Sequence, residues 1–209
     1  MTGTLSIRIL TVDDHPLIRE GIATVIRNQP DMDLVAEASS GVGAIQLFRE
    51  FKPDVTLMDL RLPDISGVEA TISIRAEDPD AKVIILTTFD GDAEAKRALQ
   101  AGACGYLLKT MPPPELAAAI RQVHSGKKRI ASEIASSLAE YFGNETLSDR
   151  EIDVLKEVAK GIGNREIGKV LRVSEETVKA HIKHIMEKLN ASDRTAAVTI
   201  ALRRGIMRL

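Results

Sequence analysis

The chain has 209 residues, of which 44% are hydrophobic, 28% charged and 3% aromatic, a composition that is typical of a globular protein and excludes a low-complexity chain. With a single cysteine, Cys104, no membrane-length apolar run and no signal-peptide pattern in its first twelve residues, the sequence predicts a cytoplasmic protein without a disulfide or a membrane partner. The net charge is −6 over residues 1–126, from 12 basic and 18 acidic side chains, and +4 over residues 146–209, from 13 basic and 9 acidic side chains. This uneven distribution predicts two domains with different partners.

The first 125 residues alternate short β-branched runs with longer amphipathic stretches, which predicts five strands and five helices. The expected architecture is a doubly wound α/β fold, a parallel sheet with helices on both faces and right-handed crossovers. The predicted strands are 7–12, 34–38, 55–58, 83–86 and 106–108. The predicted helices are 17–28, 42–51, 68–77, 93–101 and 115–124.

This alternation ends after the fifth helix, at Ser125-Gly126 and a basic stretch, 127–129, that we expect to be a solvated turn. The segment Ile130–Phe142 is compatible with a short linker helix, which Gly143-Asn144 would end. The predicted parts of the chain are a first domain over 5–125, a linker over 126–145 and a second domain over 146–209.

The second domain shows no strand pattern and is predicted to be a small all-α domain of four helices. Ser148 and Glu151 form a capping box at the start of the first helix, and Ser174 caps the third. The four helices are expected at about 149–160, 164–171, 175–189 and 194–204. The second and third, separated by three residues, form a helix-turn-helix pattern, a motif that lays its second helix in the major groove of DNA.

Polar side chains follow four of the five predicted strands, at the edge where parallel sheets bind ligands. These residues are Asp13, Asp14, Asp59, Thr87 and Lys109. Three nearby carboxylates repel one another unless a cation neutralises them, and Mg²⁺ is the simplest hard divalent ion with oxygen ligands. A carboxylate can itself be a nucleophile toward phosphorus; Lys109 would then pair with the phosphoryl charge, and Thr87 would hydrogen-bond to it.

Four strings around these residues resemble the receiver domain of two-component response regulators, and the resemblance covers residues 5–125. They are DDHP at 13–16, MDLRLPDISG at 58–67, LTT at 86–88 and GYLLK at 105–109. The resemblance implies that Asp59 accepts phosphate from a sensor histidine kinase. It also implies that Mg²⁺ is bound directly by Asp14 and Asp59, by the backbone carbonyl of Arg61, and by Asp13 through water.

The same resemblance implies a switch pair, Thr87 and Tyr106, that responds to the phosphoryl group. Thr87 would move toward it, Tyr106 would follow, and the surface of the fourth helix and fifth strand would change. Thr110 departs from the acidic residue that often follows the receiver lysine.

Two other functions are open to the residues alone. A metal-dependent phosphatase with an aspartyl nucleophile typically needs a second acid two residues later, where this chain has Arg61. A phosphorylation-independent adaptor would use the C-terminal helices to bind protein. Neither explains both sets of motifs, so we expect a regulator and no enzyme.

On the predicted recognition helix, four apolar residues share one face and are expected to pack inward: Val178, Ile182, Ile185 and Leu189. The residues pointing elsewhere form a candidate DNA-reading face: Lys179, Ala180, Lys183 and His184. Glu175 and Glu176 at the start of this helix suit its dipole but lie awkwardly for DNA.

The wider sequence resembles the LuxR-type DNA-binding domain over residues 146–205, through LSDREI at 147–152, GIGNREI at 161–167 and SEETVKAHI at 174–182. With the receiver, the whole chain is similar to the NarL/FixJ class. The resemblance implies that Lys179, Ala180 and Lys183 approach base edges of promoter DNA. Weaker candidates, mainly for phosphate contacts, are His184, Thr177, Asn164 and Arg165.

The last predicted helix carries small apolar residues, Ala196, Ala197, Ile200 and Ala201. The resemblance implies a homodimer face, which suits paired half-sites on DNA. Packing onto the helix's own domain is the simpler alternative.

Overall fold

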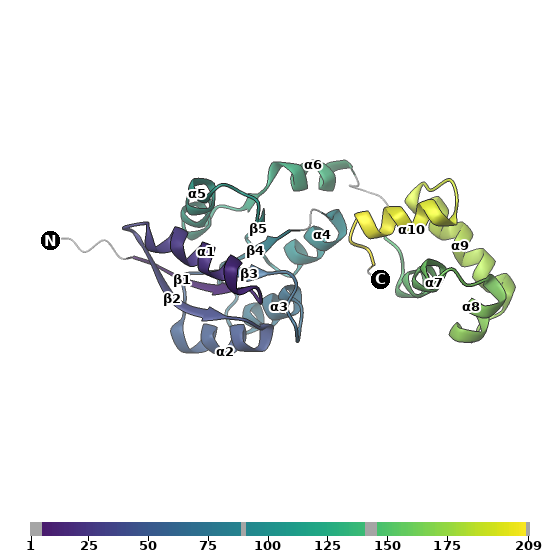
Figure 1. Ribbon diagram of the computed structural model, residues 1–209, viewed down its shortest axis with the longest axis horizontal. Coiled ribbons are helices and arrows are strands. Elements are labelled where there is room, and N and C mark those ends of the chain that lie inside the picture. The colour runs from purple at the N-terminus through teal and green to yellow at the C-terminus, as the bar shows by residue number, and fades with distance from the viewer. Residues whose placement is uncertain (1–5, 89–90, 141–145, 208–209) are drawn as a thin grey trace. The chain divides into compact units, whose positions relative to one another are not determined.

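The computed structural model describes residues 6–88, 91–140 and 146–207, and most of its elements are labelled in Figure 1. The chain divides into two compact units. The first comprises Met1–Asp90 and Ala95–Ala135, and the second comprises Gly91–Glu94 and Ser136–Leu209.

The first unit is built on one parallel sheet of six strands in the order β2-β1-β3-β4-β5-β6. The strands are β1 (Ile7–Val12), β2 (Met32–Ala38), β3 (Val55–Asp59), β4 (Val83–Thr87), β5 (Gly105–Leu108) and β6 (Arg129–Ile130). Every residue of β3 and β4 is buried, which explains why these strands are mostly apolar and show no alternation of apolar and polar residues. The predicted doubly wound α/β fold is confirmed, with one strand more than expected.

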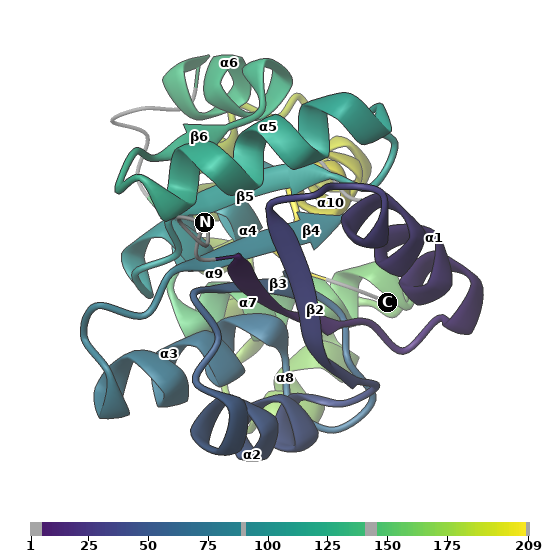
Figure 2. The same ribbon diagram turned by 90° about the vertical axis from the view of Figure 1, so that its left-hand side faces the viewer.

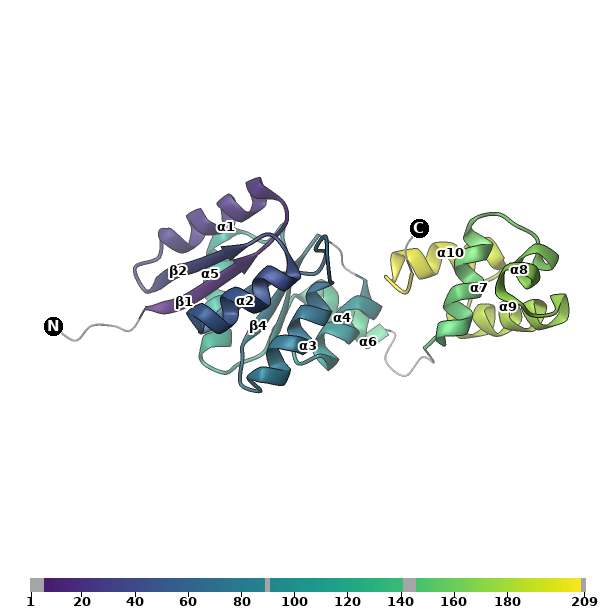
Figure 3. The ribbon, with the colours of Figure 1, turned by 90° about the horizontal axis from the view of Figure 1, so that it is seen from below.

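Helices cover both faces of this sheet (Figures 2 and 3). The helices α1 and α5 pack on one face, where Ile26 and Ile120 join Ile9, Leu57 and Ile84 of the strands in one apolar core. The helices α2, α3 and α4 lie on the other face. The helices of this unit are α1 (Pro16–Arg27), α2 (Gly41–Phe51), α3 (Gly67–Glu77), α4 (Asp92–Gln100, from Ala95 on) and α5 (Pro113–His124).

The sixth strand, Arg129–Ile130, was not predicted. Its register pairs Tyr106 with Ile130, the amide of Arg129 donates to the carbonyl of Cys104, and the amide of Ala131 donates to that of Tyr106, both at 3.0 Å. The expectation of a solvated turn was therefore wrong for Arg129. Two residues are too few to show a period, and their extended conformation comes from pairing with the edge of β5.

The predicted linker helix is present as α6 (Ser132–Glu140), which begins in the first unit and ends in the second. Its expected continuation to Phe142 and the stop at Gly143-Asn144 lie outside the described residues.

The second unit is built on four helices around an aliphatic core that includes Val154, Ile167, Val178, Ile185 and Ala201. They are α7 (Asp149–Ala159), α8 (Asn164–Leu171), α9 (Glu175–Leu189) and α10 (Arg194–Arg203). Their positions confirm the four helices expected from the sequence. Across the described parts of both units, no helix combines the length and the apolar character that a membrane span requires.

The helix-turn-helix pattern is confirmed, with residues 172–174 joining α8 to α9. A Cβ atom at Gly168 would lie 2.7 Å from the carbonyl oxygen of Val173, so the turn packs directly on α8. The hydroxyl of Ser174 accepts a hydrogen bond from the amide of Thr177 at 3.0 Å. A tight turn and a cap together fix where α9 begins.

A buried carboxylate joins the start of α7 to the end of α9. The predicted capping box is present, because Oε2 of Glu151 accepts from the Ser148 amide at 2.7 Å while the Ser148 hydroxyl accepts from the Glu151 amide. Lys188 near the end of α9 places its Nζ 2.9 Å from the same oxygen. Burial works to raise the pKa of Glu151, but the hydrogen bonds from Ser148 and Lys188 outweigh it and lower the pKa.

Candidate functional site

The carboxyl ends of four neighbouring strands meet at one edge of the sheet. The parallel register places Val12 beside Met58, Asp59 beside Leu86, and Thr87 beside Leu108. The predicted polar residues occupy these positions or follow them directly, so the fold gathers them as the sequence predicts.

One ammonium group joins two buried carboxylates in this pocket. The Nζ atom of Lys109 lies 2.7 Å from Oδ2 of Asp13 and 2.9 Å from Oδ2 of Asp59. Asp13 is 1% exposed, Asp59 is 3% exposed, and the Lys109 side chain is 7% exposed. Charges this deeply buried are stable only when they are paired.

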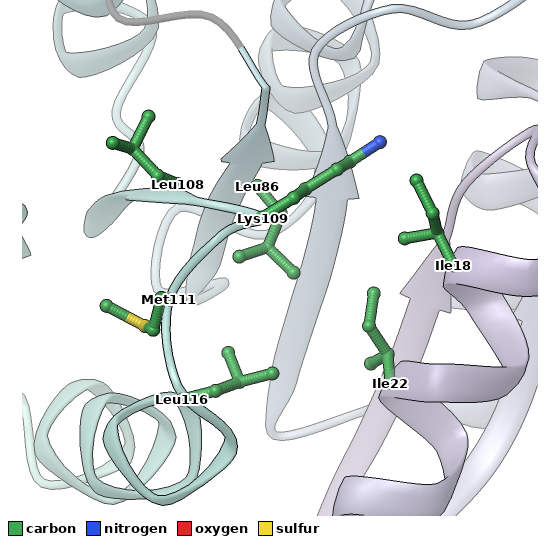
Figure 4. A pocket seen from close by; sticks show the side chains of 7 residues that line it. All are labelled: Ile18, Ile22, Leu86, Leu108, Lys109, Met111 and Leu116. Carbon is green, nitrogen blue, oxygen red and sulfur yellow. The ribbon is translucent and has the colours of Figure 1, made fainter.

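Apolar packing aims Lys109 at the carboxylates. Its aliphatic stem borders a cavity of about 40 Å³ that is lined by side chains of α1, β4, β5 and α5 and of the loop between β5 and α5. The apolar residues that line it are Ile18, Ile22, Leu86, Leu108, Met111 and Leu116, and Figure 4 shows the ammonium pointing away from Leu108, Met111 and Leu116. A lysine with a buried stem keeps its charged end at the polar side of such a wall.

The pocket has more negative than positive charge. Three carboxylates and one ammonium, from Asp13, Asp14, Asp59 and Lys109, give a formal charge of −2 when all are ionised. Burial raises the pKa of Asp59; the hydrogen bond and charge of Lys109 oppose the rise, whereas the charge of Asp13 adds to it. A divalent cation would balance this excess.

Four donor groups lie close enough to share one cation. Single ligand atoms of Asp13, Asp14, His15 and Asp59 all fall within 4.8 Å of one another. Asp14 is the accessible carboxylate, with 36% of its side chain exposed, and its Oδ1 lies 2.6 Å from Nδ1 of His15. These oxygens fit a hard ion such as Mg²⁺.

The backbone around the pocket is also held in place. The amide of Arg61 hydrogen-bonds to the carboxylate of Asp59 and favours its ionised form, while the Arg61 side chain is exposed. The guanidinium of Arg19 donates to the carbonyl of Asp13 at 2.6 Å, and the His15 amide donates to Oδ1 of Asp13 at 2.9 Å.

The two residues expected to form a switch lie on adjacent strands. Thr87 ends β4 and is 1% exposed, and its carbonyl accepts from the Lys109 amide at 2.8 Å. Tyr106 lies on β5 opposite Ile85 and is fully buried.

In the second unit, the residues of the candidate reading face are exposed on α9. Val178, Ile185 and Leu189 are buried and Ile182 packs against them, so the predicted inward face is confirmed. The exposed residues are Thr177, Lys179, Ala180, Lys183 and His184.

Both lysines of this face have acidic neighbours one helical turn away. Nζ of Lys179 lies 2.9 Å from Oε1 of Glu175, and this carboxylate raises the pKa of Lys179. Nζ of Lys183 lies 3.8 Å from Oε1 of Glu187. Exposed pairs of this kind are weak, so either lysine can exchange its partner for a phosphate or a base.

Comparison with known proteins identifies both units. Residues 9–121 match the family described as the response regulator receiver domain, and residues 145–201 match the luxR family of bacterial regulatory proteins. The chain is 42% identical to the transcriptional regulatory protein YxjL of Bacillus subtilis, over 96% of this chain and 97% of that protein. It is 39% identical to the transcriptional regulatory protein LiaR of the same organism, over 96% and 99%.

The chain is a two-component response regulator. It belongs to the NarL/FixJ class, which joins a receiver domain to a LuxR-type domain, and it is a DNA-binding regulator of transcription. A solved structure of RcsB from Salmonella enterica serovar Typhimurium, bound to a promoter in the presence of the phosphomimetic BeF₃⁻, is similar to it with a TM-score of 0.73. That likeness has 25% sequence identity and covers 93% of this chain and 97% of the other.

The structure bears differently on two of the predicted surfaces of the DNA-binding domain. Asn164 begins α8 with its carboxamide oxygen buried, which does not affect the predicted phosphate contact, because only its NH₂ group or its backbone amide can donate to a phosphate oxygen. Ala197 and Ala201 of α10 lie in the core of their own unit. The other two residues of the expected dimer face, Ala196 and Ile200, are partly exposed, and Ile200 also packs against that core.

Sequence reasoning missed three residues that shape the receiver pocket. His15 contacts Asp14, Arg19 holds the backbone of Asp13, and Asp64 anchors the loop after Asp59. The position of His15 beside the two aspartates was the available signal. Arg19 and Asp64 act through backbone groups, and such contacts leave no pattern in the sequence.

Proposed function

We propose that Asp59 is the phosphoryl acceptor of this response regulator. The observation that carries the proposal is the contact of the Lys109 ammonium with the two buried carboxylates, Asp59 and Asp13. An oxygen of Asp59 would attack phosphorus while the bond to the histidine nitrogen of the kinase breaks, and the electron pair would stay on that nitrogen. Lys109 would then pair with a phosphoryl oxygen, and the Thr87 hydroxyl would donate to another.

We propose Mg²⁺ as the cofactor, held directly by Asp14 and Asp59, by the carbonyl of Arg61, and by Asp13 through water. The formal charge of −2 in the pocket and the short separation of its oxygens support this ligand set. Bound there, the ion would neutralise charge on the transferring phosphoryl group. The chain's own residues would align the acceptor oxygen and keep Lys109 beside it.

The receiver would accept the phosphoryl group without turning over phosphate esters. The residue two positions after Asp59 is Arg61, which cannot donate a proton as the general acid of an aspartyl phosphatase does. The chain is therefore a substrate of its kinase, and its output is the binding of DNA.

For the second domain, we propose that Lys179, Ala180 and Lys183 meet base edges in the major groove. Their exposure on one face of α9 supports this assignment. Contacts that mainly position the protein on phosphates are assigned to Thr177, His184, Asn164 and Arg165. A homodimer would place two copies of α9 on paired half-sites.

Phosphorylation would act by shifting a population of states. Thr87 would turn toward the phosphoryl group, and the α4–β5 surface next to Tyr106 would change with it, altering dimerisation and the arrangement of the domains. We assign the receiver to 5–125, the linker to 126–145 and the DNA-binding domain to 146–209. We propose a cytoplasmic location, where the protein would meet both partners, a sensor histidine kinase and promoter DNA.

Labelling with acetyl phosphate tests the acceptor. With Mg²⁺ present, the wild-type chain should gain one phosphoryl group, detected by mass spectrometry of the intact protein. Asp59→Asn should gain none, whereas Asp54→Asn, at the opposite end of β3, should be labelled normally. Undiminished labelling of Asp59→Asn would exclude the assignment.

A further inference from the structure

The loop that follows Asp59 is anchored to a distant helix by one carboxylate. Oδ1 of Asp64 accepts from the amide of Gly41 at 2.8 Å, and Oδ2 accepts from the amide of Val42 at 2.9 Å. The third amide of α2, that of Gly43, donates to the hydroxyl of Ser40 at 3.1 Å. Two of the first three amides of α2 are therefore satisfied by a residue that lies 23 and 22 positions away in the sequence.

A second contact shows that the loop lies directly on α2. A Cβ atom at Gly41 would lie 2.5 Å from Cγ1 of Ile65 and 3.0 Å from the carbonyl oxygen of Ile65. A larger residue at this position would force the side chain of Ile65, or the loop itself, to shift. The Val42 amide, with smaller contributions from neighbouring amides, lowers the pKa of Asp64 to about 2, so this anchor is ionised at neutral pH.

The two ends of the same loop, at Leu60 and Gly67, are held together next to the end of β3. The amide of Gly67 donates to the carbonyl of Leu60 at 3.0 Å. A Cβ atom at Gly67 would lie only 2.0 Å from the carbonyl oxygen of Asp59. Residues 60–66 are thus held at the base by Gly67 and at the tip by Asp64 and Ile65.

Arg61 lies between these two anchors. Its amide already bonds to the carboxylate of Asp59. We propose that Asp64 is a positioning residue for the phosphorylation site, which holds the backbone of Arg61 by fixing the tip of its loop on α2. This inference rests on the proposed function, in which the Arg61 carbonyl is a ligand of Mg²⁺.

Ser40 offers a matched control. It caps the same helix end and accepts from an amide of the same turn, but it belongs to the chain just before α2 and leaves the loop untouched. Ser40→Ala should therefore weaken α2 without moving Arg61. Asp64→Ala should weaken α2 and also release the loop.

The test is titration calorimetry of Mg²⁺ into the full-length wild type, Asp64→Ala, Asp64→Asn and Ser40→Ala, with thermal unfolding of each. Groups that support metal ligands typically change affinity by about 10- to 100-fold, so we expect the Mg²⁺ dissociation constant to rise about tenfold in Asp64→Ala. Asp64→Asn keeps a hydrogen-bond acceptor, so its Mg²⁺ dissociation constant should rise less. The dissociation constant of Ser40→Ala should stay within about twofold of the wild-type value, because this helix cap touches no metal ligand.

Acetyl phosphate labelling separates positioning from general damage. In Asp64→Ala, the Mg²⁺ concentration for half-maximal labelling should rise, while the rate at saturating Mg²⁺ stays close to that of the wild type. Unchanged Mg²⁺ affinity in both Asp64 variants, or an equal loss in Ser40→Ala, would overturn the inference. If the wild type itself binds no Mg²⁺, the proposed function fails, and this inference fails with it.

Discussion

The receiver pocket and the exposed face of α9 both depend on charged side chains, but they hold them in opposite ways. In the pocket, Lys109 is 7% exposed and touches two buried carboxylates. On α9, Lys179 and Lys183 are 56% and 73% exposed, and each meets one acidic side chain in water. Chemistry in the pocket should therefore depend on single residues, whereas DNA binding should depend on a sum of weaker contacts.

The largest effect is expected in the pocket. Lys109→Ala should slow labelling by acetyl phosphate about 100-fold, because a positioned charge is lost from a site shielded from water. Lys82→Ala is the matched control, since Lys82 precedes β4 and its Nζ donates to the His124 carbonyl at 2.7 Å, away from the pocket. If Lys109→Ala were labelled at a rate close to that of Lys82→Ala, the pocket would not depend on single residues, and its contrast with the exposed face of α9 would disappear.

A buried charge in the DNA-binding domain should behave like the pocket. Lys188→Ala leaves Glu151, which is 4% exposed, without its cation and should destabilise the domain by about 3 kcal/mol. Native-state hydrogen exchange of α7 and α9 amides measures this free energy for the domain alone. Lys156→Ala, which breaks an exposed pair with Asp153 on the same helix, α7, should cost less than about 1 kcal/mol. An equal loss of unfolding free energy in the two variants would show that burial of the ion pair does not decide how much it stabilises the domain.

The exposed face of α9 should respond more mildly. Lys183→Ala should weaken binding to promoter DNA about tenfold, the low end of the range for a base contact. Fluorescence anisotropy over a range of salt concentrations would measure it, with Lys160→Ala as a lysine outside α9. A loss that is uniform across DNA sequences would assign Lys183 to phosphate; wild-type affinity would exclude a contact.

The smallest effect concerns pH. The pKa of Asp64 is lowered to about 2 from an ordinary value of 3.8, so its stabilising contribution is complete above 3.8 and disappears as pH falls toward 2. The difference in Tm between the wild type and Asp64→Asn should be constant from pH 7 to 5 and should shrink by pH 3. The corresponding difference for Ser40→Ala should not depend on pH. A difference for Asp64→Asn that grows in acid would contradict the lowered pKa.

The sequence predicts the pocket better than the contacts that support it. Strand periodicity and the geometry of parallel sheets are enough to bring Asp13, Asp59 and Lys109 to one edge. The anchoring of Asp64 on α2 depends on where a loop meets a helix 22 to 23 residues earlier, and no local spacing encodes that meeting. The pairing of Arg129 with β5 was missed for the same reason.

In the DNA-binding domain, the sequence predicts which face of α9 is exposed, but not which single groups on the other helices are buried. The helical period alone separates the buried Val178 and Ile185 from the exposed Lys179 and Lys183. The buried oxygen of Asn164 and the burial of Ala197 depend on packing between helices, which periodicity describes only coarsely.

The central claim is that a phosphoryl group on Asp59 controls the binding of DNA by α9. The direct measurement is the affinity of the wild type and Asp59→Asn for genomic fragments recovered with the wild type, with and without acetyl phosphate and Mg²⁺. The account predicts that the phosphodonor changes the Kd of the wild type and leaves that of Asp59→Asn unchanged. Equal changes in both proteins, or no change in the labelled wild type, would contradict it.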